Sequence, residues 1–182
     1  MNPFDYSTIN KIGQDVFIGN NVEIKRPNLV TIGNHVAIDS GFYCTTQLVL
    51  GNHIHISAQV TVIGGAKGLL TLKNFVSIGA GSRMICGSDG FVGHGLMGYG
   101  VPEELMDEVY IAPILFENFA SVGTNVVIMP GITLAEGSVV GACSMLTKDT
   151  EPWTIYVGIP AKPIKIRPKE KMIEYAKTMG YL

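Results

Sequence analysis

The chain has 182 residues, a formal net charge of −2 and only 15% charged residues. This length fits one domain with a substantial core, and the weak charge argues against a protein that binds nucleic acid through its phosphates. The N-terminus lacks a signal-peptide pattern, and no segment approaches the run of about 18 apolar residues that a membrane span needs. We therefore expect a soluble, cytoplasmic protein. Its mean hydropathy of +0.30 predicts that self-association hides some apolar surface.

The cysteines give no sign of metal binding or redox chemistry. There are three of them, Cys44, Cys86 and Cys143, and none forms a CxxC pair. An odd number without ligand-like spacing is typical of buried thiols in a reducing cytoplasm.

A six-residue repeat runs through most of the chain. Aliphatic residues followed by glycine recur, as in Ile12-Gly13 and Val140-Gly141, and steps of six from such pairs reach eighteen positions. These are Ile12, Ile18, Ile24, Ile32, Ile38, Cys44, Leu50, Ile56, Val62, Leu72, Ile78, Met84, Phe116, Val122, Ile128, Leu134, Val140 and Leu146. Two short insertions, at residues 25–28 and 64–68, and one long insertion interrupt this grid.

The period of six predicts a column of short strands. A helix would repeat its apolar residues at three and four, and a flat strand would alternate at two. Three hexads close one triangular coil, and coils stack at the spacing of neighbouring strands, about 4.8 Å. We therefore predict an all-β domain over residues 1–167.

The long interruption is glycine-rich and carries polar candidates for a site. Residues 86–113 contain Ser88, Asp89 and His94. A column with a filled interior and flat sides has no pocket of its own. We therefore predict that a protruding loop, residues 88–111, reaches toward a neighbouring subunit and closes a binding site at the interface.

The C-terminal residues 168–182 predict a short helix. Pro168 suits a first helical position, and Met172, Tyr175, Ala176 and Met179 fall on one face. We expect this helix to cap the open end of the column, where an uncovered edge would favour aggregation.

Residues 12–167 resemble the hexapeptide-repeat acyltransferases. The most specific part is "VGTNVVIMPGITLAEGSVVGACSMLTKDTEPWTIYVGIPAKPIK", residues 122–165. The resemblance implies a left-handed parallel β-helix, a homotrimer, and acetyl-CoA as co-substrate in a groove between subunits. It places Ala142, Thr147 and Lys148 along that groove, and Lys162 and Lys165 at the nucleotide phosphates, a role that the lysine charge suits.

A narrower resemblance concerns the acceptor. The segments "HISAQVTVIGG" (55–65) and "CGSDGF" (86–91), with Pro-Glu-Glu at 102–104, resemble the branch that acylates nucleotide-linked or surface-polysaccharide sugars. The better-known galactoside and antibiotic acetyltransferases have a catalytic histidine at about the position of Asp89, and this sequence departs from them there.

Acyl transfer to a hydroxyl requires a base, and three residues are candidates. Histidine titrates near cellular pH, which favours His55 and His94. Asp89 could orient an imidazole or receive a sugar hydroxyl or amine. By contrast, His35 and His53 each follow Gly-Asn and lie eighteen residues apart. We expect them to stack in adjacent coils at one corner and face solvent.

Three kinds of function remain open from the sequence. The first is direct acetyl transfer from acetyl-CoA to a hydroxyl or amino group of a sugar. The second is a carbonic-anhydrase-like zinc enzyme on the same fold, which would need a third histidine ligand beside His35 and His53. The third is a non-catalytic assembly protein, for which the long loop and the "GIPAK" tail (158–162) have no evident use.

Overall fold

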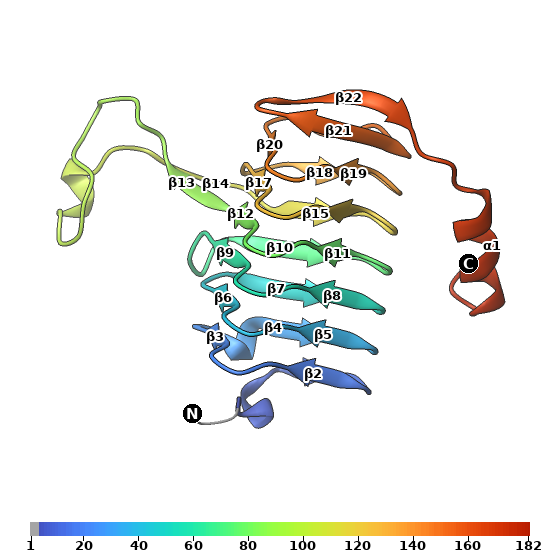
Figure 1. The fold of residues 1–182 in the computed structure, drawn as a ribbon. Coiled ribbons are helices and arrows are strands. Elements are labelled where there is room, and N and C mark those ends of the chain that lie inside the picture. Colours follow the sequence, from blue (N-terminus) through green and yellow to red (C-terminus); the bar gives the residue numbers. More distant parts are fainter. Residues whose placement is uncertain (1–3) are drawn as a thin grey trace.

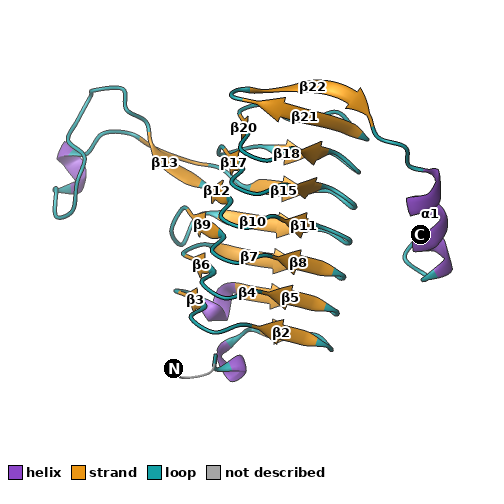
Figure 2. Ribbon diagram, in the orientation of Figure 1, coloured by secondary structure: helices purple, strands orange, loops and turns teal. Residues whose placement is uncertain are grey.

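The computed structural model describes residues 4–182 and shows a triangular column of parallel strands (Figures 1 and 2). Each turn of the chain contributes one short strand to each of three sheets, A, B and C. A two-stranded arch leaves the column on one side, and the C-terminal helix stands on the other side (Figure 1).

The strands are short, as a six-residue repeat requires. Sheet A contains β1 (Lys11–Ile12), β4 (Val30–Ile32), β7 (Gln47–Leu50), β10 (Leu69–Leu72), β15 (Ile114–Phe116) and β18 (Thr133–Leu134). Sheet B contains β2 (Val16–Ile18), β5 (Val36–Ile38), β8 (Ile54–Ile56), β11 (Ser77–Ile78), β16 (Ser121–Val122), β19 (Val139–Val140), β21 (Thr154–Gly158) and β22 (Ala161–Ile166). Sheet C contains β3 (Glu23–Ile24), β6 (Tyr43–Cys44), β9 (Thr61–Ile63), β12 (Arg83–Ile85), β17 (Val127–Ile128) and β20 (Met145–Leu146).

The repeat positions form the core. All eighteen predicted positions are buried except Ile12, which is partly buried. Neighbouring coils place like positions in register, for example Ile38 beside Ile56 and Ile56 beside Ile78. Aliphatic side chains therefore stack in continuous rows inside the column, and this packing confirms the period-six interpretation.

Two of the three corners of the column are regular turns. The corner between sheets A and B, which we call the ring edge, comprises residues 13–15, 33–35, 51–53, 73–75, 117–119 and 135–137. His35, His53, Phe75 and Phe119 each occupy it with a positive φ of 56–63°. The corner between sheets B and C repeats the same conformation, and Cys143 lies there with φ of 54°. Cys44 and Cys86 are buried as predicted, but the prediction of a buried thiol is wrong for Cys143, which this outer corner leaves exposed.

The third corner, between sheets C and A, carries every interruption of the repeat. We call it the loop edge, and it comprises residues 25–29, 45–46, 64–68, 86–113, 129–132 and 147–149. The first insertion forms a 3₁₀ turn, Pro27–Leu29, and the second is the turn at residues 64–68. The third is the arch, whose strands β13 (Gly87–Asp89) and β14 (Val109–Ile111) pair antiparallel. Two further 3₁₀ turns are Tyr6–Thr8, before β1, and Glu103–Leu105, within the arch.

The C-terminal helix forms where the sequence predicts it but does not cap the column. Helix α1 (Glu170–Thr178) packs beside the ring edge, with Met172 and Ala176 against Phe75 and Phe119. The end of the column is covered instead by the antiparallel hairpin of β21 and β22. The rings of Phe75 and Phe119 on the ring edge supply the apolar surface against which the helix is buried. Over residues 4–182, no helix is long and apolar enough to cross a membrane.

Candidate active site

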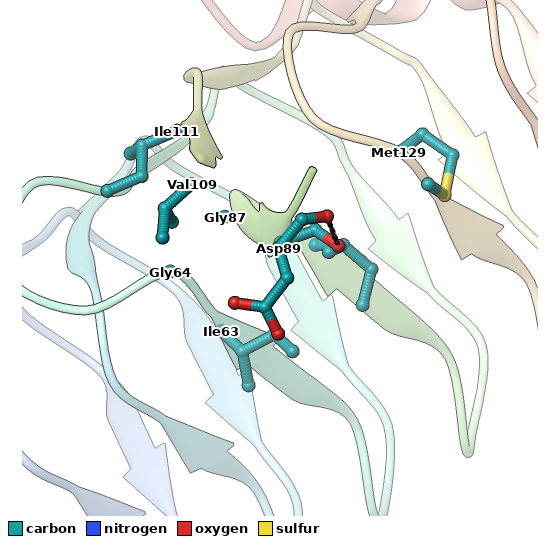
Figure 3. A pocket seen from close by; sticks show the side chains of 9 residues that line it. Ile63, Gly64, Gly87, Asp89, Val109, Ile111 and Met129 are labelled. Atoms are coloured by element: carbon teal, nitrogen blue, oxygen red, sulfur yellow. Dashed lines mark hydrogen bonds between the residues drawn. The ribbon is translucent and has the colours of Figure 1, made fainter. Parts of the chain in front are cut away.

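The loop edge contains the cavities of interest. The arch cavity, of about 460 Å³, lies where the arch leaves the column and is lined by Ile63, Gly64, Ile85, Gly87, Ser88, Asp89, Val109, Ile111 and Met129 (Figure 3). A neighbouring cavity of about 590 Å³ lies between the turn at residues 64–67 and the arch. The tail cavity, of about 270 Å³, is lined by Leu146, Thr147, Lys148, Asp149, Tyr156, Pro160, Ala161, Lys162 and Pro163. The first two volumes fall in the range typical of small-molecule sites.

Asp89 is the one charged residue of the arch cavity. It ends β13, opposite Val109, and Figure 3 shows its side chain pointing into the cavity. The neighbouring Ser88 hydroxyl donates to the Asp89 carbonyl at 3.1 Å. Among the described residues, no hydrogen bond or ion pair reaches the Asp89 carboxylate. The cavity therefore presents a solvent-exposed carboxyl group without a protein partner beside aliphatic walls.

His94 lies farther along the arch and does not line either arch-side cavity. Its side chain is 73% exposed, and Nδ1 lies 3.8 Å from a carboxylate oxygen of Glu108. The arch is held instead by Asp107, which is only 5% exposed and accepts the backbone N–H groups of Gly93, His94 and Glu108. Burial raises the pKa of Asp107, but these backbone donors outweigh it, so the pKa lies below its usual value.

His55 lies on another face of the column. It is the outward residue of β8, in sheet B, and its Nε2 is 3.0 Å from Oδ2 of Asp39. The pair is largely exposed and lines none of the three cavities. Within one chain the structure therefore does not bring His55, Asp89 and His94 together. Over residues 4–182 no three His, Cys, Asp or Glu side chains gather as a metal site would require.

Three of the five predicted CoA-binding residues share the tail cavity. Thr147 and Lys148 follow β20, and Lys162 lies opposite them on β22. Lys165 is farther along β22, paired with Ile155, and Ala142 lies at the corner between sheets B and C. Neither lines the cavity, so the two lie outside the cluster formed by the other three.

The apolar walls of the arch cavity were not predicted from the sequence. Ile63, Ile85 and Met129 each directly follow a core position, and the register makes them neighbours at the loop edge. A usable signal existed for two of them, because Ile63 and Ile85 are apolar and directly precede the insertions at 64–68 and 86–113, whereas the coil of Met129 carries no insertion.

Comparisons with known proteins agree with this architecture. No family model matches the sequence. The dTDP-4-amino-4,6-dideoxy-D-glucose acyltransferase of Escherichia coli is 28% identical over 168 residues, covering 90% of this chain and 84% of that protein. A chloramphenicol acetyltransferase of Agrobacterium fabrum is 31% identical over 161 residues, covering 80% of this chain and 70% of that protein.

A solved structure matches the whole fold. The N-acyltransferase AntD from Bacillus cereus, in complex with dTDP and 3-hydroxybutyryl-CoA, aligns with a TM-score of 0.88 and 28% identity over 96% of this chain and 93% of that one. The match confirms the predicted left-handed parallel β-helix. With its six-residue repeat, its column and these relatives, the chain belongs to the hexapeptide-repeat acyltransferase family.

Proposed function

We propose that the protein transfers an acyl group, acetyl in the simplest case, from coenzyme A to the amino group of a nucleotide-linked deoxy sugar. The observation that carries this proposal is the unpaired carboxylate of Asp89 in an apolar cavity on the same edge as the tail cavity. The relatives support the acceptor class. The name of the Escherichia coli protein specifies a dTDP-linked amino sugar, and a variant of AntD has been solved with dTDP-4-amino-4,6-dideoxyglucose and coenzyme A.

Asp89 supplies what an amine acceptor needs. A carboxylate without a protein partner can bind the sugar ammonium, orient it and accept its proton. The free amine then attacks the thioester carbonyl. The C–N bond forms as the C–S bond breaks, and the CoA thiolate leaves and takes up the proton that the nitrogen loses as the amide forms. Once a neighbouring subunit covers the exposed Val109 and Ile111, the aliphatic walls exclude water and so favour attack by the amine over hydrolysis.

The donor binds at the tail cavity in this proposal. Lys148 and Lys162 provide positive charge for the nucleotide phosphates, and Thr147 lies at the loop edge, where the pantetheine arm would pass. Lys165 and Ala142 lie outside this cavity and would take part only through contacts made in an assembled oligomer.

We further propose a homotrimer. The arch exposes an unusual number of large apolar side chains, which self-association would cover. They are Phe91, Val92, Leu96, Met97, Tyr99, Leu105, Met106, Val109, Tyr110 and Ile111. In this arrangement the arch reaches a neighbouring subunit, residues 1–167 form the acyltransferase domain, and residues 168–182 belong to it as a docked helix. The free thiols fit a cytoplasmic enzyme, and a nucleotide-linked sugar fits a role in polysaccharide biosynthesis.

The test is transfer from acetyl-CoA to dTDP-4-amino-4,6-dideoxyglucose by wild type and by Asp89→Asn, which cannot accept the proton. We expect kcat/KM to fall by about 10²–10⁴-fold while CoA affinity is unchanged. Glu108→Gln removes an exposed carboxylate of the arch outside both arch-side cavities and is the matched control. Full activity of Asp89→Asn would refute the role of Asp89.

A hydroxyl acceptor is the second candidate, and the His55–Asp39 pair favours it. A carboxylate at 3.0 Å orients the imidazole as a general base requires. In that case His55→Ala, rather than Asp89→Asn, abolishes transfer, and the acceptor carrying a hydroxyl in place of the amine is the better substrate. His94→Ala belongs in the same series, because the exposed imidazole could act in a neighbouring subunit's site.

A further inference from the structure

We propose that Met129 determines which acyl groups the enzyme accepts. This inference rests on the proposed function, since it concerns the acyl donor of the same site. It begins with the strand register at the loop edge. Met84 pairs with Ile128, and Ile128 pairs with Leu146. The residues that directly follow Met84, Ile128 and Leu146 are therefore stacked in the same order. These residues are Ile85, Met129 and Thr147, and they lie in three successive coils.

This order places Met129 between the two cavities. Ile85 and Met129 line the arch cavity, and Thr147, one coil beyond, lines the tail cavity. The Met129 N–H donates to the Leu146 carbonyl at 3.1 Å, which fixes the two coils against each other. At about 4.8 Å per coil, Ile85 and Thr147 are about 10 Å apart. A thioester that extends from Thr147 toward Asp89 must therefore pass Met129.

The side chain of Met129 suits a determinant of acyl size. It is partly buried against the core and turns its remaining surface to the arch cavity, whose other walls include Ile63, Ile85, Val109 and Ile111. An apolar surface of this kind binds the carbon chain of an acyl group rather than a sugar hydroxyl. Methionine is unbranched and flexible, so it can fill part of a cavity and yield to a larger group.

The surroundings separate this acyl surface from the charged part of the site. Asp89 is the one ionised group among the residues that line the arch cavity, and Lys148 and Lys162 belong to the tail cavity. Shortening Met129 therefore changes the volume open to the acyl chain without removing a proton acceptor or a phosphate contact. Acyl preference and acceptor chemistry should thus be separable by mutation.

The experiment compares wild type with Met129→Ala and Met129→Phe. Calorimetry measures the affinity for acetyl-, propionyl- and butyryl-CoA without acceptor, and kcat/KM is then measured with one amino sugar. One methylene in an apolar pocket changes kcat/KM by roughly 10–200-fold. We therefore expect Met129→Ala to raise the ratio of kcat/KM for butyryl-CoA to that for acetyl-CoA at least about tenfold. We expect Met129→Phe to lower it. Met145→Ala removes a half-buried methionine of the same sheet that lines none of the cavities, and it should leave the ratio unchanged.

The outcomes distinguish this inference from the proposed function. An unchanged acyl ratio in a folded Met129→Ala that still binds CoA overturns the role of Met129. A shift in acceptor preference with an unaltered acyl ratio overturns it as well. If the acyl affinities shift as expected but no amino sugar is acylated, the acceptor assignment fails and the role of Met129 stands. A wild-type protein that binds no CoA contradicts both.

Discussion

The ring edge and the loop edge are two corners of the same column, and they show opposite ways of using a repeat. At the ring edge, Asn34, Asn52, Asn74 and Asn118 each accept a backbone N–H from the preceding coil through the side-chain oxygen. Rings stack beside them with centroids 4.7–5.2 Å apart, from His35 through His53 and Phe75 to Phe119. Helix α1 then covers part of this surface.

The loop edge lacks such a ladder. Its coils differ in length, and its outward side chains line cavities instead of filling a stack. The core beneath is the same in both regions, since the inward positions of the coils are buried, apart from the partly buried Ile12. The comparison indicates that the repeat supplies a rigid scaffold and that one edge is closed for stability, while the irregular edge is the one at which we propose binding.

The largest effect should come from removing the arch. Replacing residues 88–110 with Asn-Gly would close Gly87 and Ile111, which already pair, by a two-residue turn. We expect transfer activity to fall to background while the chain still folds as a column, because most arch side chains are exposed. Activity and circular dichroism of the shortened protein test this. A column that fails to fold would show that the loop edge also carries stability.

The ring edge should respond in the opposite way. Phe119 is 3% exposed and packs between Phe75 and Trp153, and Gly137 has no side chain where the Trp153 ring lies. Phe119→Ala should cost about 3–5 kcal/mol of stability, as other buried aromatic truncations do. Thermal unfolding measures the loss, and activity per folded molecule should be retained. A large loss of activity at unchanged stability would contradict the division between the edges.

A smaller effect is expected at Asp107, which orders the arch without lining the arch cavity. Asp107→Asn keeps the shape but weakens the bonds to the backbone N–H groups. Because small displacements of catalytic groups are costly, we expect kcat/KM to fall about tenfold to a hundredfold, with the melting temperature nearly unchanged. Steady-state kinetics and thermal unfolding of the same preparation give kcat/KM and the melting temperature. A marked fall of the melting temperature together with the fall of kcat/KM would point to a general structural role.

The smallest effect concerns pH at the ring edge. His53 bonds to the Tyr181 hydroxyl at 3.0 Å, and partial burial, followed by the nearby His35, lowers its pKa. The unfolded chain therefore binds the proton more tightly than the folded chain. The stability from neutral His53 is present above about pH 6.5 and is lost as pH falls through the lower pKa of the folded state.

The charged groups near His53 are few, and a substitution isolates its contribution. His35, which is paired with Asp15 at 2.9 Å, stacks on one side of it, while Phe75 and Tyr181 cover the others. His53→Phe continues the rings of Phe75 and Phe119 and should flatten the fall of the melting temperature between pH 7.5 and 5. An unaltered pH profile would mean that other groups cause it.

Much of the fold could be predicted because burial is periodic. Ile56 or Val140 must point inward in any arrangement that stacks coils of six, so the core followed from spacing alone. The stacking of His35 on His53 followed from the same spacing, but the prediction that both face solvent is wrong for His53, which is partly buried against Tyr181. The position of helix α1 did not, because the ring surface that attracts it is assembled from residues such as Phe75 and Phe119, which are far apart in sequence.

The site was less predictable because it depends on outward positions. Asp89 could be named from the loop, whereas Thr147, Lys148 and Lys162 were implied by the resemblance of the tail to the acyltransferase family. Each of the four lines a cavity in the structure. Their roles remain proposals. Met129 escaped notice because an apolar residue after a core position resembles ordinary strand sequence until the register sets it beside Ile85.

The most direct test of the account is a crystal structure with CoA and dTDP-4-amino-4,6-dideoxyglucose bound together. We predict that both ligands lie on the loop edge, with the CoA sulfur in contact with Met129 and the sugar amine within hydrogen-bonding distance of Asp89, about 2.7–3.2 Å. A thiol placed beside His55 on sheet B, with Asp89 contacting neither ligand, would contradict it.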